Sequence, residues 1–269
     1  MKVIQTGWYY FQSIFRMLFN IKNWPMLVPL FLQRSISGTQ WVNLRRPPLR
    51  IFVRGAMDVW SVKETFLDRF YTRYGVPFEN GWQVVDIGAG VGDFSIFAAY
   101  GNPDSRVIAY EPYPESYRLM IKNLTVNAID NVLAFQEALW REDGELWLDV
   151  SNDEPLEIVS NASPPQTQDP GTFKVQGISL ENALRTQEIR KLDLLKLDCE
   201  GAEYEILLNT SLEVMSKIER IIMEYHDLDA DKNHRKLVLF MKDAGFQVST
   251  YENQVHDDIG YLFATRVGK

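Results

Sequence analysis

Three glycines and one acid form the most informative pattern in this sequence. Gly88, Gly90 and Gly92 follow a short apolar run and precede a segment with helical spacing, which is the pattern of a tight turn from a strand into a helix. Glycines leave no side chains in such a turn, so a ligand can lie against bare backbone. Nineteen positions after Gly92, the next apolar run ends in Glu111, where a carboxylate can accept both ribose hydroxyls of a nucleoside. The pattern therefore predicts a nucleoside site, although the glycines alone could make only a tight connection.

The spacing of the glycines narrows the choice of ligand. A dinucleotide fingerprint requires its third glycine one position later, where this chain has Asp93. The missing glycine argues against a pyrophosphate at the helix N-terminus, and so against a nicotinamide-dependent oxidoreductase. A smaller nucleoside fits the pattern better, and S-adenosylmethionine is the commonest of these.

A second group of carboxylates follows an apolar run that begins at Leu192. Asp198 ends this predicted strand, and Glu200 and Glu203 follow in the turn and in the first turn of the next helix. Acids favour a helix N-terminus through the backbone dipole, so both glutamates could be structural. Three carboxylates beside a ligand-binding turn repel one another, and a cation, a hydrogen-bonded substrate or a shared proton would offset that repulsion. Cys199 between them is predicted to be a small buried apolar residue.

The next predicted strand ends in an acid and an imidazole. Because side chains alternate along a strand, Glu224 and His226 are expected on one face. This pair suits general-base catalysis, since a carboxylate can raise the pKa of a histidine. A histidine at a strand end can also be a hydrogen-bonded surface residue without a chemical role.

These groups require alternating strands and helices to position them. Core strands are predicted at 84–85, 106–111, 131–136, 192–198, 218–225, 246–251 and 260–265. Helices are predicted at 61–74, from 93 onward, and at 114–127, 179–184, 204–215 and 233–244. A segment at 145–149 is predicted to be a hairpin partner, and the polar stretch 151–172 a long surface loop. The alternation predicts a Rossmann-like α/β fold with a mostly parallel sheet, helices on both faces and ligands at the C-terminal strand ends.

Composition bounds the class of protein. The chain has 269 residues, of which 46% are apolar and 24% charged, as expected for a soluble globular protein. Its net charge of −8 disfavours a nucleic-acid partner. The single cysteine excludes an internal disulfide, and no Cys/His cluster suggests zinc. We therefore expect a reducing, cytoplasmic setting.

The N-terminal segment differs sharply from the rest of the chain. Residues 1–57 carry eight Lys or Arg and no acid. Within 1–33, Arg16 and Lys22 interrupt the apolar run, which excludes a membrane span, and no signal-peptide cleavage site follows. An amphipathic helix is predicted, and Pro25 and Pro29 are expected to break the helical pattern beyond it. Its apolar face comprises Ile4, Trp8, Phe11, Phe15 and Leu18, and its polar face comprises Gln5, Gln12, Arg16 and Asn20.

Several roles are open for this helix. Aromatic residues opposite a cationic face suit the surface of an anionic membrane, so residues 1–33 are predicted to make a peripheral membrane contact. Packing on the catalytic domain or on a second subunit is the alternative, and an organelle transit peptide is a minor one. The segment Arg45–Leu49 marks a boundary. We divide the chain into a basic, aromatic extension at 1–54 and an α/β domain at 55–269.

The sequence from about Gly55 to Lys269 resembles the FkbM-type methyltransferases, which use S-adenosylmethionine. The resemblance is carried by Val85-Asp-Ile-Gly-Ala-Gly-Val-Gly92, Tyr110-Glu-Pro112 and Lys196-Leu-Asp-Cys-Glu-Gly-Ala-Glu203, with further similarity at 177–181 and 224–226. It implies a seven-strand methyltransferase sheet whose last strand is antiparallel. It also implies O-methylation of a hydroxyl on a sugar, glycan or natural product. Cys199 replaces a more usual aliphatic residue, and the N-terminal extension has no counterpart in the family pattern.

Roles can be assigned to individual residues on this basis. The expected cofactor contacts are Asp86, Gly88, Ala89, Gly90 and Gly92 at the methionine end, Glu111 and Pro112 at the ribose, Glu137 or Ala138 at the adenine, and Asp198. Asp198 or His226 is expected to take the proton of the acceptor hydroxyl, and Glu224 to orient His226. Glu200 and Glu203 are expected to hold the substrate or to fix the adjacent turn, with Glu200 counted in the catalytic group.

Alternatives to this function differ in class. Amino-group methylation is disfavoured because the strand at 192–198 leads into Asp-Cys-Glu-Gly and not into an Asn/Asp-Pro-Pro-aromatic segment. A non-catalytic nucleoside-binding or membrane-docked scaffold is the main rival, and the intact carboxylates at three strand ends argue against it. Metal dependence stays open, since Asp198, Glu200 and Glu224 could bind magnesium although nothing requires it. The acceptor and the oligomeric state are not specified by the sequence.

Overall fold

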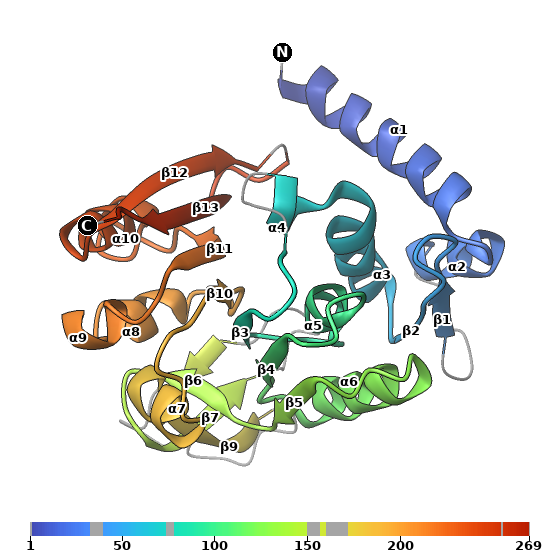
Figure 1. Cartoon of the computed structure of the whole chain (residues 1–269). Coiled ribbons are helices and arrows are strands. Elements are labelled where there is room, and N and C mark those ends of the chain that lie inside the picture. The colour runs from blue at the N-terminus through green and yellow to red at the C-terminus, as the bar shows by residue number, and fades with distance from the viewer. Residues whose placement is uncertain are drawn as a thin grey trace.

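The computed structural model of the chain describes residues 2–32, 40–73, 78–149, 157–159, 172–253 and 255–268. Its central element is a seven-stranded sheet with the strand order β12-β13-β11-β10-β3-β4-β5 (Figure 1). These strands are β3 (Gln83–Ile87), β4 (Arg106–Tyr110), β5 (Val132–Phe135), β10 (Leu194–Leu197), β11 (Arg220–His226), β12 (Phe246–Glu252) and β13 (Ile259–Arg266). Only β13 runs antiparallel to its neighbours in this sheet. The predicted mostly parallel sheet with an antiparallel last strand is confirmed.

The core lies on both faces of this sheet, because side chains alternate along each strand. Val84 and Val107 face one hydrophobic cluster, and their neighbours Val85 and Ile108 face another. The first cluster is covered by α5 (Asp93–Ala99) and α6 (Pro114–Val126). The second is covered by α7 (Leu180–Thr186), α8 (Glu203–Leu207), α9 (Leu212–Met215) and α10 (His234–Asp243) (Figure 1). Helices therefore flank both faces, as predicted.

A second sheet of four strands was not predicted. Its order is β6-β9-β7-β8, formed by β6 (Ala138–Trp140), β7 (Gly144–Asp149), β8 (Glu157–Val159) and β9 (Thr172–Ser179). The segment predicted to be a hairpin partner, 145–149, lies in β7, which pairs antiparallel with β8 and β9 in this second sheet. The predicted loop at 151–172 contains β8 and the first residue of β9, and its other residues lie outside the described ones. Pairing of β7 with β9 joins segments distant in sequence, which local periodicity does not reveal.

Two predicted helices are interrupted. The segment 61–74 contains the end of α3 (Ala56–Lys63), a π-helical turn (Glu64–Asp68) and α4 (Phe70–Arg73), with Arg69 in the left-handed region at φ 55°. The predicted helix at 204–215 is divided into α8 and α9, because the Ser211 side chain accepts a hydrogen bond from Val214 N at 3.3 Å and so begins a new helix. In contrast, Ser179 caps α7 and Asn233 caps α10 near the predicted starts.

The N-terminal extension folds as α1 (Lys2–Asn20), α2 (Trp24–Phe31), β1 (Gln40–Asn43) and β2 (Arg50–Val53) (Figure 1). The helix predicted there is confirmed, but the break at the prolines is wrong. Pro25 lies in the first turn of α2, where its missing N–H has no intrahelical partner, and Pro29 lies inside that helix two residues before its end. Ile21 and Ile51 are buried in the same cluster as Val84. The division at residue 54 stays a prediction.

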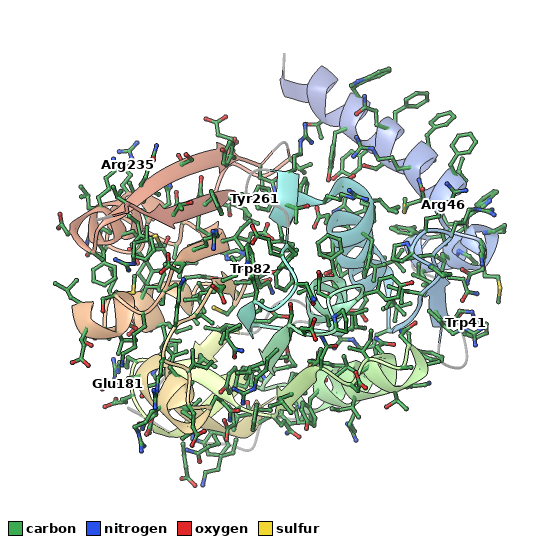
Figure 2. All side chains as sticks on the ribbon, viewed as in Figure 1. Trp41, Arg46, Trp82, Glu181, Arg235 and Tyr261 are labelled. Atoms are coloured by element: carbon green, nitrogen blue, oxygen red, sulfur yellow. The ribbon has the colours of Figure 1, made fainter. Side chains whose placement is uncertain are left out.

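None of the described helices combines the length and the hydropathy that crossing a bilayer requires. The orientation of α1 is unusual nonetheless. Its polar side faces the protein: Arg16 forms an ion pair with the buried carboxylate of Asp68, and Ser13 is buried. Its aromatic side is exposed, with Phe19 71% and Trp8 59% accessible to solvent. Figure 2 shows ring side chains of this helix projecting away from the body of the molecule.

Candidate cofactor and catalytic site

A cavity of about 1520 Å³ opens at the C-terminal ends of β3, β10 and β11. The glycine turn after β3 forms its floor, and the acids that follow β10 and β11 line its centre. Side chains of α1, α2 and α3 line the opposite wall. The edge of the sheet at the carboxyl ends of parallel strands is where α/β proteins bind ligands, so the two sequence patterns meet where the fold predicts a site.

The glycine turn has the backbone that only glycine adopts without strain. Gly88, Gly90 and Gly92 have φ angles of 72°, 54° and 84°. A Cβ on Gly88 would lie 1.8 Å from the carbonyl oxygen of Asp198, so β10 packs directly against the turn. A Cβ on Gly90 would meet no described atom within 4 Å. Gly90, which lines the cavity, is therefore the point where a ligand can approach the backbone.

Glu111 closes the glycine turn from the side of β4. Its side chain is buried, Oε2 accepts a hydrogen bond from Gly90 N at 2.7 Å, and Oε1 accepts one from Tyr113 N at 2.9 Å. Burial raises the pKa of Glu111 to about 7, although both N–H groups and Arg54 oppose this. Each carboxylate oxygen retains a further lone pair, so the group can still accept ribose hydroxyls. Pro112 lines the cavity beside it.

Asp86 does not line the cavity itself but contacts Lys196, which does. Asp86 is fully buried, its Oδ2 accepts a hydrogen bond from Ser95 Oγ at 2.6 Å, and its Oδ1 lies 3.1 Å from Lys196 Nζ. Lys196 Nζ donates to the carbonyl oxygen of Gly88 at 2.8 Å. Burial lowers the pKa of Lys196, but the carboxylates of Asp86 and Asp198 outweigh it and raise that pKa above its ordinary value. Sequence reasoning gave Lys196 no role, although a lysine between leucines in a buried strand was a visible signal.

Of the two residues expected to contact the adenine, one lines the cavity and the other does not. Ala138 lines the cavity, together with Leu139 and Leu148 of the second sheet. Glu137 is half-buried, and its carboxylate is not part of the cavity lining. Burial and the nearby Asp143 raise the pKa of Glu137. Ala138, Leu139 and Leu148 thus present an apolar surface to the cavity, and the expected adenine contacts of Ala138 and Glu137 stay predictions.

Asp198 lies between the glycine turn and the open cavity. Its Oδ2 accepts a hydrogen bond from the Tyr71 hydroxyl at 3.0 Å and lies 3.7 Å from Lys196 Nζ. Burial, followed by the charge of Asp198, raises the pKa of Tyr71 well above its ordinary value, so the phenol is a hydrogen-bond donor. Tyr71 comes from α4, far from Asp198 in sequence, and sequence reasoning missed it. The pair holds the Asp198 carboxylate at the cavity.

His226 is held between two glutamates. Its Nε2 lies 3.0 Å from Glu200 Oε2, and its Nδ1 lies 3.4 Å from Glu203 Oε1. Although burial opposes it, contacts with these two carboxylates raise the pKa of His226 to about 12. The two carboxylates therefore favour the protonated imidazole, and the role of His226 as a base stays a prediction. The carboxylates at ion-pair distance belong to Glu200 and Glu203. The expected role of Glu224 in orienting His226 stays a prediction.

Glu203 and Glu200 have different surroundings. Glu203 is fully buried, and its Oε1 accepts a hydrogen bond from Cys199 N at 3.0 Å, which fixes the turn after β10. Glu200 has φ 54°, a left-handed conformation that is rare outside glycine, and lines the cavity. The geometry thus fits the structural alternative for Glu203 and leaves Glu200 available to an acceptor.

Comparison with known proteins agrees with this geometry. The family model of the methyltransferase FkbM domain matches residues 86–248, from the buried Asp86 into β12. The chain belongs to this family. The resemblance drawn from the sequence is confirmed, and the cofactor expected at the glycine turn, S-adenosylmethionine, is that of the family.

Relatives of this FkbM-family methyltransferase cover most of its α/β domain. It is 27% identical to Methyltransferase 1 of Beauveria bassiana, over 70% of this chain and 80% of that one. It is 24% identical to the 31-O-demethyl-FK506 methyltransferase FkbM of Streptomyces tacrolimicus, over 69% and 80% of the two chains. The hexuronic acid methyltransferase AglP of Haloferax volcanii is 21% identical over 66% and 70%.

A solved structure shows the same fold. The methyltransferase FkbM of Methylobacillus flagellatus superposes with a TM-score of 0.50 at 13% sequence identity, over 72% of this chain and 46% of that one. At this identity the likeness establishes the fold and nothing more specific.

Two further acids, Glu224 and Glu64, line this cavity. The sequence analysis gave Glu224 a different role and did not identify Glu64. Burial, together with the charges of Asp198 and Glu64, raises the pKa of Glu224 well above its ordinary value. Burial raises the pKa of Glu64 to about 7, although Lys63 and a hydrogen bond from Trp60 Nε1 at 2.8 Å oppose it. Glu64 begins the π-helical turn, and such a turn rotates the following side chains away from the positions expected for an α-helix.

Aromatic side chains also line this cavity, close to the acids. Tyr9 and Tyr10 of α1, Trp60 of α3 and Tyr261 of β13 all line it. The rings of Tyr261 and Phe70 are 4.7 Å apart, and Figure 2 shows Tyr261 beside α4. These rings come from segments separated by the whole length of the chain, so no local pattern could have grouped them.

Proposed function

We propose that this protein is an O-methyltransferase that acts on a hydroxyl group of a sugar, a glycan or a natural product. The observation that carries the proposal is Asp198: a carboxylate at the cavity, adjacent to the glycine turn and held by Tyr71 and Lys196. An alcohol is a poor nucleophile until a base removes its proton. The relatives support an acceptor of this class, since one is named as a methyltransferase of a hexuronic acid and another of a demethylated natural product.

Three parts of the chain hold the cofactor in this proposal. The backbone of Gly88 and Gly90 cradles the methionine end, Glu111 accepts the ribose hydroxyls, and Ala138 with Leu139 covers the adenine. The fit rests on two features: the space beside Gly90 that a Cβ would enter, and the lone pairs that Glu111 still offers after its two backbone contacts. S-adenosylmethionine supplies a methyl group on a sulfonium, which an oxygen attacks in line.

Asp198 is the residue that accepts the proton in this proposal. As the acceptor oxygen bonds to the methyl carbon, the bond from that carbon to the sulfonium sulfur would break and leave its electron pair on sulfur. The O–H bond of the acceptor would break as well, and its proton would pass to the Asp198 carboxylate. His226 is less suited, because Glu200 and Glu203 favour the protonated imidazole. Tyr71 and Lys196 act by positioning Asp198. Trp60, Tyr261 and Glu64 offer rings and polar groups to the acceptor, a combination that suits a polar ring such as a sugar.

The test of this proposal is methyl transfer to a panel of uronic acids, glycans and hydroxylated natural products, with donor labelled at the methyl carbon. We expect NMR of the product to show the label on oxygen. Asp198→Asn should lower the turnover number by roughly 10²- to 10⁴-fold and leave S-adenosylmethionine affinity within about threefold. Asp193→Asn is the matched control, because Asp193 accepts from Gln83 N near the opposite end of β10. Label on nitrogen, or unchanged turnover in Asp198→Asn, would contradict the proposal.

We also propose that α1 makes a peripheral contact with an anionic membrane. Its polar side is occupied by Arg16 and Asp68, while its exposed side carries Trp8, Phe11, Phe15 and Phe19. Cationic residues near the C-terminal end of α1 are exposed as well: Lys22, Arg45 and Arg46, the last of which is labelled in Figure 2. Exposed aromatic rings beside cations are the features by which a helix lies in a membrane interface. Because α1 also lines the cavity, an acceptor attached to a lipid could reach the site from the membrane.

A further inference from the structure

Three side chains from the ends of two neighbouring strands converge in the cavity and could hold a metal ion. Asp198 and Glu200 follow β10, and His226 ends β11. Each offers one ligand atom, and the three atoms lie within 4.8 Å of one another. Two carboxylate oxygens and one imidazole nitrogen form a donor set that divalent first-row transition metals accept. All three residues line the cavity, so an ion held there would retain open coordination positions.

The second observation is the state of the buried imidazole. His226 is 8% exposed, and its Nδ1 has no hydrogen-bond partner among the described residues, although Glu203 Oε1 lies 3.4 Å away. Oε2 of the fully buried Glu203 also has no described partner. A metal-bound histidine usually donates its second ring N–H to a carboxylate, which fixes its tautomer. If an ion replaced the Nε2 proton, which would pass to solvent, Nδ1–H would still face Glu203 Oε1.

The charges around His226 favour an added cation. Glu200, Glu203 and Glu224 lie near one another at the ends of β10 and β11, with Asp198 beside them. His226 supplies one positive charge to this group, and Lys196 is already occupied by Asp86 and the carbonyl of Gly88. Like charges in a partly buried site repel one another unless a counter-ion is present. A divalent ion that replaced the Nε2 proton of His226 would add one net positive charge at the point where the acids converge.

We propose that Asp198, Glu200 and His226 bind a divalent transition-metal ion, with Glu203 orienting His226, and that the ion receives the acceptor hydroxyl. The inference rests on the proposed function for its chemical meaning. An ion at that position would orient the hydroxyl oxygen and lower its pKa. A carboxylate has two oxygens, so Asp198 can bind the ion through one and accept the proton on the other.

The test is a titration of the purified chain with Mn²⁺, followed by the loss of the EPR signal of free Mn²⁺, without S-adenosylmethionine or any acceptor. We expect one bound ion per chain, and Glu200→Gln and His226→Gln should each weaken binding at least tenfold. Glu205→Gln is the matched control, because Glu205 lies on the same segment but forms ion pairs with Arg141 and Lys232. Circular dichroism of each variant checks that it is folded.

The metal site and the proposed function can fail separately in this experiment. If the folded wild type leaves millimolar Mn²⁺ free, it has no metal site at these residues. The same conclusion follows if Glu200→Gln and His226→Gln bind Mn²⁺ as well as the wild type does. If Glu200→Gln instead weakens S-adenosylmethionine binding while Mn²⁺ does not bind, the acids offset the charge of the sulfonium. Mn²⁺ binding at this triad in a protein that transfers no methyl group would support the site and contradict the proposed function.

Discussion

Lys196 Nζ donates a hydrogen bond to the carbonyl oxygen of Gly88 at 2.8 Å while lying 3.1 Å from Oδ1 of Asp86. The contact joins the strand that leads to Asp198, the proposed base, to the glycine turn proposed to hold the cofactor. Lys196 and Asp86 are almost completely excluded from water, where a charge pair is weakened little by solvent. The ammonium of Lys196 therefore holds the glycine turn in its conformation, and the two sequence motifs act as one structural unit.

Removing the charge of Lys196 should destabilise the protein strongly. Lys196→Met keeps the length of the side chain but leaves the carboxylate of Asp86 buried without a counter-ion, which typically costs about 3–5 kcal/mol. Urea unfolding followed by circular dichroism measures the loss. Lys191→Met is the control, since Lys191 is exposed and pairs only at the surface, and its effect should stay below about 1 kcal/mol. Equal stability of the two variants would show that the buried ion pair does not hold the turn.

Glu64 should make stability depend on pH. Its pKa is raised in the folded chain from 4.5 to about 7, mainly by burial. Between these two values the folded state holds more protons than the unfolded state, so the free energy of unfolding falls as pH rises through this window. Glu64→Gln removes the charge and can still accept from Trp60. It should raise stability at pH 8 by on the order of 1–3 kcal/mol and change it little at pH 4.

The pH experiment compares thermal unfolding of wild type and Glu64→Gln at both pH values. Glu181→Gln on α7 is the control, because Glu181 is exposed and lies outside the cavity (Figure 2). The control should show no gain at pH 8. A loss of stability in Glu64→Gln at pH 8 would mean that the ionised carboxylate is stabilising, and that its contacts with Trp60 and Lys63 outweigh burial.

The exposed face of α1 should determine membrane binding. Replacing Phe11, Phe15 and Phe19 by Ser removes three rings that are each at least 43% exposed. Because each ring buried in the interface contributes on the order of 1–2 kcal/mol, co-sedimentation with anionic phosphatidylglycerol vesicles should fall by at least about 100-fold. Wild type should bind less at high salt, since the exposed cations contribute. The control replaces Leu212, Leu228 and Leu239, which are equally exposed elsewhere on the surface. Wild type that does not sediment with these vesicles contradicts the membrane proposal.

The sequence specified the sheet and the cofactor turn because both are local patterns. Val84, Val85 and the glycines indicate a strand and a turn within a dozen residues, and Glu111 follows at a spacing that the fold imposes. Asp198 and His226 were predictable for the same reason, since each ends an apolar run. The direction of the last strand came from the resemblance to a family, and the structure confirms it.

The parts that were not predicted depend on contacts between distant segments. Tyr71 meets Asp198 from a helix that precedes the sheet, and Glu64, which begins the π-helical turn, lines the same cavity. The carboxylates at ion-pair distance from His226 come from the turn after β10 and from the first residue of α8, and not from its own strand. The pairing of β7 with β9 crosses residues whose sequence shows no periodicity. Periodicity and motif spacing carry no information on such contacts.

The measurement that tests the cofactor site most directly is a calorimetric titration of the purified protein with S-adenosylmethionine, beside Glu111→Ala. We expect micromolar binding by the wild type. In Glu111→Ala we expect a loss of about 10- to 100-fold, because charged hydrogen bonds of this kind contribute about 1.5–3 kcal/mol each. A binding titration that is unchanged in Glu111→Ala would show that Glu111 does not anchor the ribose. Absence of binding by folded wild type would contradict a cofactor site at the glycine turn.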